Sequence, residues 1–231
     1  MDYENLELQV GVDWAQLLSP FMVGTPEVPA RYDKIGTFLK TEKDNGRVFF
    51  PKGTDVFKAF RATPLADVRV ILLAQDPYPK AGFANGLAFA TDSKTPPVSL
   101  KVIYDALEEP KLQLERRQDG QFDWYSQGVL MLNSALTVEE GKPGSHADVW
   151  APFTEFLIDA LNKVKRDLIY IAVGAPAKKF TEKVNPFRNF VYTCEHPANA
   201  ARKMRKWEHN NVFIQTNFAI RLNKLGTEIN W

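Results

Sequence analysis

Four short runs of apolar, largely β-branched residues form the strongest pattern along the chain of 231 residues. Strands that are buried on both faces have this continuous apolar character, whereas half-exposed strands alternate apolar and polar residues. The runs predict buried strands at Val68–Ala74, Val129–Asn133, Leu168–Gly174 and Phe190–Glu195.

Segments with helical periodicity separate these runs. In residues 150–164, apolar residues recur every three or four positions, as on one face of a helix. Such patterns, with Ser99 as an N-cap and Gly226 as a terminator, predict helices at Ser99–Glu108, Trp150–Val164, Ala177–Val184 and about Asn210–Leu225. The alternation of strands and helices predicts an α/β fold: a three-layer αβα arrangement with a central four-stranded, mainly parallel sheet.

Prolines interrupt the apolar patches of the first fifty residues. Pro20, Pro26 and Pro29 break the periodicity, so short helices and a wrapping segment are expected there. Thr54 is expected to N-cap the next helix. Because the sequence contains no repeat and no linker, residues 1–231 are expected to form one domain that includes the segment 1–50.

Each predicted strand delivers a polar group or a glycine at its carboxyl end. Asp76 follows the first strand, Asn133 and Gly174 close the second and third, and His196 follows the fourth. Taken singly, Asp76 and Asn133 are more often caps, and His196 is more often a buried structural imidazole. The carboxyl ends of parallel strands meet at one edge, where ligand crevices form. The convergence of an acid, an amide and an imidazole therefore favours a functional site.

The charge balance indicates no general affinity for nucleic acid. The chain has 29 basic and 28 acidic residues and a net charge of +1, so nucleic-acid contacts require local clusters. Two basic clusters follow predicted strand ends, although such clusters are usually solvated surface. They are Arg202-Lys203-Met204-Arg205-Lys206 and the group Lys178, Lys179 and Lys183.

Other compositional features exclude several classes of protein. The single cysteine, Cys194, rules out an internal disulfide and suits a reducing compartment. No apolar stretch is long enough to span a bilayer, and the acidic start does not resemble a secretory signal. We expect a location inside the cell or a host cell, in the cytoplasm or the nucleus. With three histidines and no metal-ligand spacing, we expect no metal and no cofactor. His146 is expected to support the site, and His209 to lie on the surface.

An ordered set of motifs carries a family resemblance. Its main members are Gln75-Asp76-Pro77-Tyr78, Phe89, Leu130-Met131-Leu132-Asn133 and Glu195-His196-Pro197. Weaker members include Pro96-Pro97-Val98-Ser99-Leu100, Ser145-His146 and the terminal Ile229-Asn230-Trp231. In this order and spacing, the set resembles the family 1 uracil-DNA glycosylases from about Trp14 to the last residue.

The resemblance implies base excision repair chemistry without a cofactor. Asp76 supplies an anion near the sugar and orients water, and a neutral His196 donates a hydrogen bond to uracil O2. Asn133 pairs with the N3–H and O4 of uracil. Phe89 stacks on the flipped base, Tyr78 occupies the space of a thymine methyl group, and Gln75 contacts the base.

The resemblance also implies a DNA-contacting surface. Its expected residues are Pro96, Pro97, Ser99, Gly174, Ala175, Ala198, Ala200, Arg202, Lys203 and Arg205. The expected partner is uracil-containing DNA, single- or double-stranded, bound by a monomer. A protein inhibitor or a replication partner is not identified by the sequence.

Departures from the family pattern lie in the parts that handle DNA. Pro79 stands where the family usually has histidine and resembles the poxviral branch, which indicates a divergent viral or phage-like member. Ala175 and Ala198 replace serines that hold phosphates, and Ala200 replaces a leucine wedge. Three functions stay open: a glycosylase with an altered DNA grip, a glycosylase-like DNA-binding or replication-accessory protein with weak or no catalysis, and a glycosylase for another modified pyrimidine.

Overall fold

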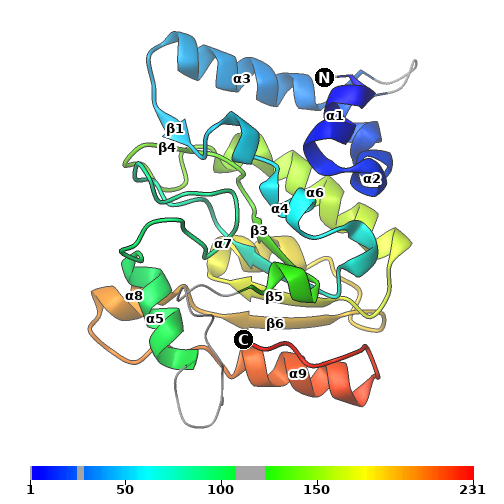
Figure 1. Cartoon of the computed structure of the whole chain (residues 1–231), viewed down its shortest axis with the longest axis vertical. Coiled ribbons are helices and arrows are strands. Elements are labelled where there is room, and N and C mark those ends of the chain that lie inside the picture. The colour runs from blue at the N-terminus through cyan, green and yellow to red at the C-terminus, as the bar shows by residue number, and fades with distance from the viewer. Residues whose placement is uncertain (1, 25–28, 108–122) are drawn as a thin grey trace.

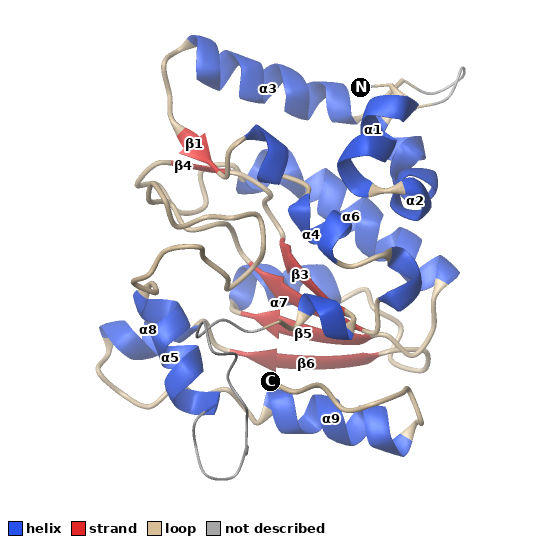
Figure 2. Cartoon of the chain, viewed as in Figure 1, coloured by secondary structure: helices blue, strands red, loops and turns tan. Residues whose placement is uncertain are grey.

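A four-stranded parallel sheet forms the centre of the molecule in a computed structural model, which describes residues 2–24, 29–107 and 123–231. The strand order is β3-β2-β5-β6, and helices flank the sheet (Figure 2). The predicted three-layer fold is confirmed. The strands are β2 (Val70–Ala74), β3 (Val129–Asn133), β5 (Ile169–Val173) and β6 (Phe190–Cys194).

Burial explains why these four runs become strands. Every residue of β2, β3 and β5 is buried, as continuous apolar runs require. The register pairs Ala74 with Asn133 and Val173 with Cys194, so the carboxyl ends of the strands lie level. The chain runs from β2 to β3 on one side and then returns to β5 on the other, which is the arrangement that opens a crevice beyond β2.

Helices cover both faces of the sheet (Figure 1). One face is contacted by α7 (Ala175–Thr181), which packs against α6 (Ala147–Val164). Contacts to the strands also come from α4 (Lys58–Ala62) and α9 (Val212–Leu222). Beyond the carboxyl ends of the strands, α5 (Val98–Leu107) packs against α8 (Pro197–Arg202).

The amino-terminal segment consists of short helices, as expected. They are α1 (Tyr3–Val10), α2 (Val12–Met22) and α3 (Tyr32–Asp44). Contacts of α1 with α4 and of α2 and α3 with α6 attach this segment to the rest. A small antiparallel pair, β1 (Phe49–Phe50) with β4 (Val138–Glu139), was not predicted. The 3₁₀ helices are η1 (Gly53–Asp55), η2 (Leu65–Asp67) and η3 (Tyr125–Gln127).

Some predicted helix boundaries are wrong. Thr54 lies inside η1, and α4 begins only at Lys58. Ser99 is the second residue of α5, so it is not the N-cap; the predicted end at Glu108 lies outside the described residues. The helix α6 begins at Ala147 and continues through Pro152. Among the described residues, none of the helices has the length and apolar character of a membrane span.

Candidate active site

A cavity of about 360 Å³ opens at the carboxyl ends of the strands, a size that suits a small ligand. It brings together the six residues predicted to act on the sugar and the base: Gln75, Asp76, Tyr78, Phe89, Asn133 and His196. Ser99, Ala198 and Arg202, which were predicted to contact DNA, also line it. Four separate chain segments, after β2, after β3, at the start of α5 and after β6, therefore build one pocket.

Asp76 is half-buried just past β2 and is held by a loop that precedes α6. The backbone amide of Gly144 donates a short hydrogen bond to Asp76 Oδ2, and Gln75 Nε2 lies 3.5 Å from the same oxygen. Burial raises the pKa of Asp76, while the Gly144 and Gln75 hydrogen bonds oppose that rise. The carboxylate is thus oriented by neutral donors. Gly144 could not be found from the sequence, because any residue except proline supplies a backbone amide.

His196 is the N-cap residue of α8, and its imidazole ring caps the first turn. Its Nδ1 accepts a hydrogen bond from the Ala198 amide at 3.2 Å. An imidazole nitrogen that accepts a bond has a lone pair, so the ring proton resides on Nε2. Burial, reinforced by Arg202, lowers the pKa of His196 from 6.5 to about 4. The ring is neutral at pH 7, and its Nε2–H is the donor that it offers to a bound molecule.

Gly174 supports this imidazole from behind. It closes β5, has φ of 87°, and would place a Cβ atom 3.2 Å from the Cβ of His196. Its amide donates to the Cys194 carbonyl at 2.9 Å. Gly174 is buried, so it supports His196 and offers no side chain to DNA.

The walls of the pocket combine an aromatic ring with an amide. Phe89 has φ of 54°, a conformation that is rare for a bulky residue and marks an imposed geometry. Its ring centroid lies 5.8 Å from that of His196. Asn133 is only 5% exposed, and within the described part of the chain its side-chain amide makes no hydrogen bond. That amide is available to a ligand.

The loop after β2 is tied to the chain after β3, which fixes the floor of the pocket. The Gln75 carbonyl accepts from Ser134 Oγ at 2.8 Å and from the Ala135 amide at 2.9 Å. Burial raises the pKa of Tyr78 far above 10, so its hydroxyl stays neutral in the wall. These contacts fix Gln75, Tyr78 and Asn133 relative to one another.

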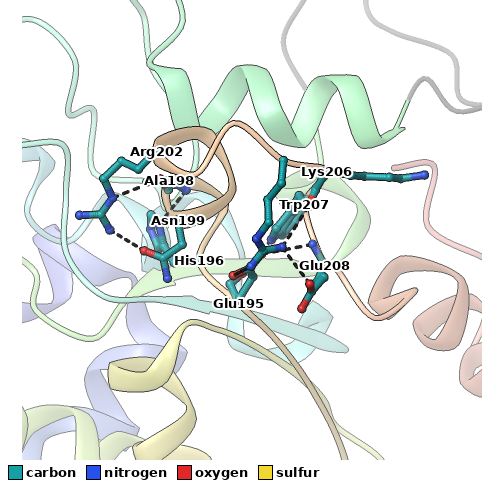
Figure 3. A network of polar contacts seen from close by, with 9 residues as sticks. Glu195, His196, Ala198, Asn199, Arg202, Lys206, Trp207 and Glu208 are labelled. Atoms are coloured by element: carbon teal, nitrogen blue, oxygen red, sulfur yellow. Dashed lines mark hydrogen bonds and ion pairs between the residues drawn. The ribbon is translucent and has the colours of Figure 1, made fainter.

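Arg202 extends over the pocket from α8 (Figure 3). Its guanidinium donates to Asn199 Oδ1 and, at 3.3 Å, to the Ala198 carbonyl. Asn199 also lines the pocket and was not predicted. Lys203 and Ala175 are exposed, whereas Pro96 and Pro97 are half-buried ahead of α5.

One of the predicted DNA contacts is wrong in its assigned role, and a second is paired within the protein. Ala200 lies within α8 and is fully buried, so its methyl group does not face a duplex. Arg205 is paired with Glu195 at 2.7 Å and with Glu208 at 3.0 Å, which neutralises its charge within the protein. At the end of α8, Met204 instead adopts φ of 47° and is 94% exposed.

The second basic cluster lies apart from the active site, and His209 differs from expectation. Lys179 and Lys183 line a separate groove against α6 with Glu155 and Asp159, away from the residues of the active-site cavity. His209 is buried at 8% exposure and packs against Trp207 and Phe213. His146 is buried too, and its Nδ1 lies 2.8 Å from Thr137 Oγ1, next to the loop that carries Gly144.

The pocket combines the Asp76 carboxylate and the His196 imidazole with the Phe89 ring and the Asn133 amide. A carboxylate beside a neutral imidazole donor stabilises opposite charges that develop on the two sides of one breaking bond. The fold and the pocket thereby define a class, the hydrolases that act on N-glycosyl bonds.

Comparison with known proteins identifies the family. Residues 60–221 match the family model "Uracil DNA glycosylase superfamily". A uracil-DNA glycosylase of Pseudomonas aeruginosa is 36% identical over 201 residues, covering 86% of each chain. That of Acinetobacter baumannii is 33% identical over 213 residues, covering 91% of this chain and 88% of its own. This chain belongs to the uracil DNA glycosylase superfamily.

Solved structures agree on the fold. The crystal structure of mimivirus uracil-DNA glycosylase superposes with a TM-score of 0.85 at 22% identity, covering 100% of this chain and 89% of that chain. A mimivirus UNG variant in complex with UGI superposes with a TM-score of 0.70 at 28% identity, covering 80% of this chain and 69% of that one.

Proposed function

We propose that this chain hydrolyses the N-glycosidic bond of deoxyuridine flipped out of DNA, which releases uracil and leaves an abasic site for base excision repair. The observation that carries this function is the pairing of two groups in one pocket. Asp76 provides an oriented carboxylate, and His196 provides an imidazole whose proton is fixed on Nε2. Relatives that are 33–36% identical carry the name of this activity.

Asp76 acts on the sugar and on water. As the C1′–N1 bond breaks, its electron pair leaves with uracil and positive charge develops on the sugar, where the carboxylate stabilises it. The water oxygen bonds to C1′, and its proton passes to Asp76. Burial favours this transfer because it raises the pKa of Asp76 towards the working pH.

His196 acts on the leaving base. Its Nε2–H donates to O2 of the uracil anion, and the neutral ring contributes through a fixed dipole. An aligned donor of this kind typically contributes about 3–4 kcal/mol to transition-state stabilisation. The donor needs no proton transfer, because the pKa of about 4 keeps the ring neutral.

Base selection follows from the walls. The amide of Asn133 presents a donor and an acceptor that match O4 and N3–H of uracil, and cytosine reverses that pattern. Phe89 stacks on the base, Tyr78 fills the space next to C5 where thymine has a methyl group, and Gln75 contacts the base at the floor.

The DNA backbone is held by the rim of the pocket. Arg202 and Lys203 supply charge, and backbone groups near Ser99, Ala175 and Ala198 replace the missing serine hydroxyls. The remaining rim candidates are Pro96 and Pro97, which shape the chain ahead of α5. This grip is weaker than one with serines, so we expect single-stranded DNA to be the better substrate.

A second candidate function is a glycosylase-like DNA-binding or replication-accessory role with weak catalysis. The replacement of both serines by Ala175 and Ala198 favours it. The intact pocket favours catalysis over that role.

Release of free uracil from single-stranded DNA separates the two functions. The wild type should release uracil, and Asp76→Asn should nearly abolish release while DNA affinity stays within about twofold, since the carboxylate acts on transition-state charge. Asp159→Asn, on the exposed face of α6, is the matched control and should retain full activity. Uracil release by Asp76→Asn at more than a tenth of the wild-type rate would refute the role of Asp76. No release by the wild type would favour the accessory role.

The organisation of the protein is also proposed here. Residues 1–231 form one domain, supported by the contacts of α1, α2 and α3 with α4 and α6, and the protein acts as a monomer. A viral or phage-like origin rests on Pro79, whereas the relatives named above are bacterial. Binding of a protein inhibitor or of a replication partner stays a prediction.

A further inference from the structure

Glu195, the residue before His196, is held by three groups of the segment 205–208 (Figure 3). The Arg205 Nη2 atom donates to Glu195 Oε2 at 2.7 Å, and the Glu208 amide donates to Oε1 at 3.3 Å. The Trp207 Nε1–H donates to the Glu195 backbone carbonyl at 2.8 Å. Both the side chain and the main chain of Glu195 are therefore held in place by this segment.

Arg205 also bonds within its own segment. Its Nη1 atom reaches Glu208 Oε1 at 3.0 Å and the Lys206 carbonyl at 3.1 Å. Its side chain is 31% exposed and that of Glu195 is 20% exposed. A guanidinium that already bridges two carboxylates has fewer N–H groups and less uncompensated charge to offer to a phosphate.

The backbone at the end of α8 closes this arrangement into one unit. The Met204 amide donates to the Ala201 carbonyl, and the Arg205 amide donates to the Ala200 carbonyl, each at 3.1 Å. This is a Schellman motif with Met204 in the left-handed position. The chain leaves β6, passes through the His196 cap and α8, turns at Met204, and returns to Glu195.

We propose that Arg205 is a positioning residue for His196, acting through Glu195, and that it is not a contact to DNA phosphate. The proposal rests on the proposed uracil release for its kinetic test only. A displaced Glu195 main chain would move the ring that follows it, and misplacement of a reacting group by about 1 Å can cost up to a hundredfold in rate.

Loss of the Arg205–Glu195 ion pair should also change the electrostatic surroundings of the ring. Loss of Arg205 would leave the Glu195 carboxylate without its cation, one residue from His196, and a nearby anion favours the protonated imidazole. The pKa of His196 should then rise. Among the described residues, the charged or titratable groups around the ring are Asp76 and Tyr78 from the loop after β2, Cys194 at the end of β6, Glu195 just after it, Arg202 of α8, and Arg205.

The kinetic test compares three arginine or lysine positions on single-stranded DNA. Arg205→Ala should lower kcat about tenfold at saturating substrate, with an unchanged slope of log affinity against log salt. Lys203→Ala is the positive control for a phosphate contact, and its slope should fall by about 0.7. Arg221→Ala removes an arginine from the Arg221–Glu228 ion pair of α9 and should change neither quantity.

An NMR titration of the imidazole rings measures the position and pKa of His196 without relying on catalysis. The chain has three histidines, so His196 signals can be assigned by substitution. Arg205→Ala should shift the His196 ring signals and raise its pKa, with those of His146 unchanged. If the wild type released no uracil, the proposed function would fail, and the ring signals and salt slope would still decide the role of Arg205.

Arg205→Lys keeps the positive charge and provides a second test of the proposal if the alanine variant misfolds. Lysine cannot bridge two carboxylates with a planar fork, so positioning predicts a lower kcat and shifted His196 signals. A phosphate contact predicts a normal kcat and normal signals. A lower salt slope in Arg205→Ala, or unshifted His196 signals in both variants, overturns the proposal.

Discussion

Met204 is the residue that we expect to enter the gap left by a flipped base. Ala200, the residue aligned with the leucine wedge of the family, is buried. Met204 is 94% exposed at the turn that ends α8, and Ala198, Asn199 and Arg202 of α8 line the pocket. Its φ of 47° directs the chain away from the helix and presents the side chain at the tip. Methionine is one of the apolar residues that proteins insert between base steps.

The size of the effect follows from the atoms removed. Met204→Ala deletes Cγ, Sδ and Cε, and at about 0.8 kcal/mol for each buried methylene-sized group the full loss is about 2.4 kcal/mol. Since about 1.4 kcal/mol is a factor of ten, uracil release from duplex DNA should fall by up to about fiftyfold. Extrusion from a single strand needs less unstacking, so that rate should stay within about twofold. Alanine and methionine both carry a Cβ atom and have the same steric penalty at positive φ. The substitution should therefore leave the backbone of the turn unchanged.

The assay is single-turnover uracil release from duplex and single-stranded DNA of one sequence. Phe187→Ala is the control, because Phe187 is 96% exposed in the turn before β6, at the opposite ends of the strands. It should leave the duplex-to-single-strand ratio unchanged. An unchanged ratio in Met204→Ala would refute the reasoning, and a collapse of duplex activity in Arg202→Ala would place the inserted group there.

Three further predictions concern the base, the DNA backbone and pH. Asn133→Asp should release some cytosine and Tyr78→Ala should release thymine, each measured as free base. If neither variant gains activity on its new base, the assigned roles of Asn133 and Tyr78 are wrong. Replacing Arg202 and Lys203 together by Ala should reduce the salt slope of single-strand binding by about 1.4, at about 0.7 per contact, and an unchanged slope would place both on solvated surface. The pKa of His196 is 6.5 in the unfolded chain and about 4 in the folded protein, so the unfolded chain takes up a proton on this ring at higher pH. The contribution of His196 to the free energy of unfolding is therefore complete above pH 6.5. It is lost as the pH falls to 4, by about 3 kcal/mol. Urea denaturation of wild type and His196→Gln should therefore show a difference that changes with pH in this window, and a constant difference would contradict the lowered pKa.

The sheet and the centre of the pocket could be predicted from the sequence because both depend on local patterns. The strand at Val129–Asn133 is observed with its predicted bounds, since a fully buried strand requires an unbroken apolar run. The level ends of parallel strands then bring Asp76, Asn133 and His196 to one cavity. Helix starts were less predictable: α6 begins three residues before Trp150, because tertiary packing tolerates Pro152 inside the helix.

The contacts of the pocket required the structure because they depend on side chains and amides from distant segments. The amide of Gly144 reaches Asp76 across 68 residues. His209 lies in a polar run, yet it is buried because Trp207 and Phe213 enclose it. Composition alone placed it on the surface, since sequence neighbours say little about which residues pack on it from elsewhere.

The basic run 202–206 shows why charge is a poor guide to where DNA is held. Its residues look equivalent in sequence, but the chain reverses direction at Met204, where a left-handed residue ends α8. Arg202, before the reversal, lies over the pocket, whereas Arg205, after it, turns inward to Glu195. Glycine normally marks such a turn, and with methionine there the sequence carries no sign of it. The same left-handed turn directs Arg205 towards Glu195 and leaves Met204 exposed. The proposed positioning of His196 and the expected insertion of Met204 into DNA therefore depend on one backbone conformation.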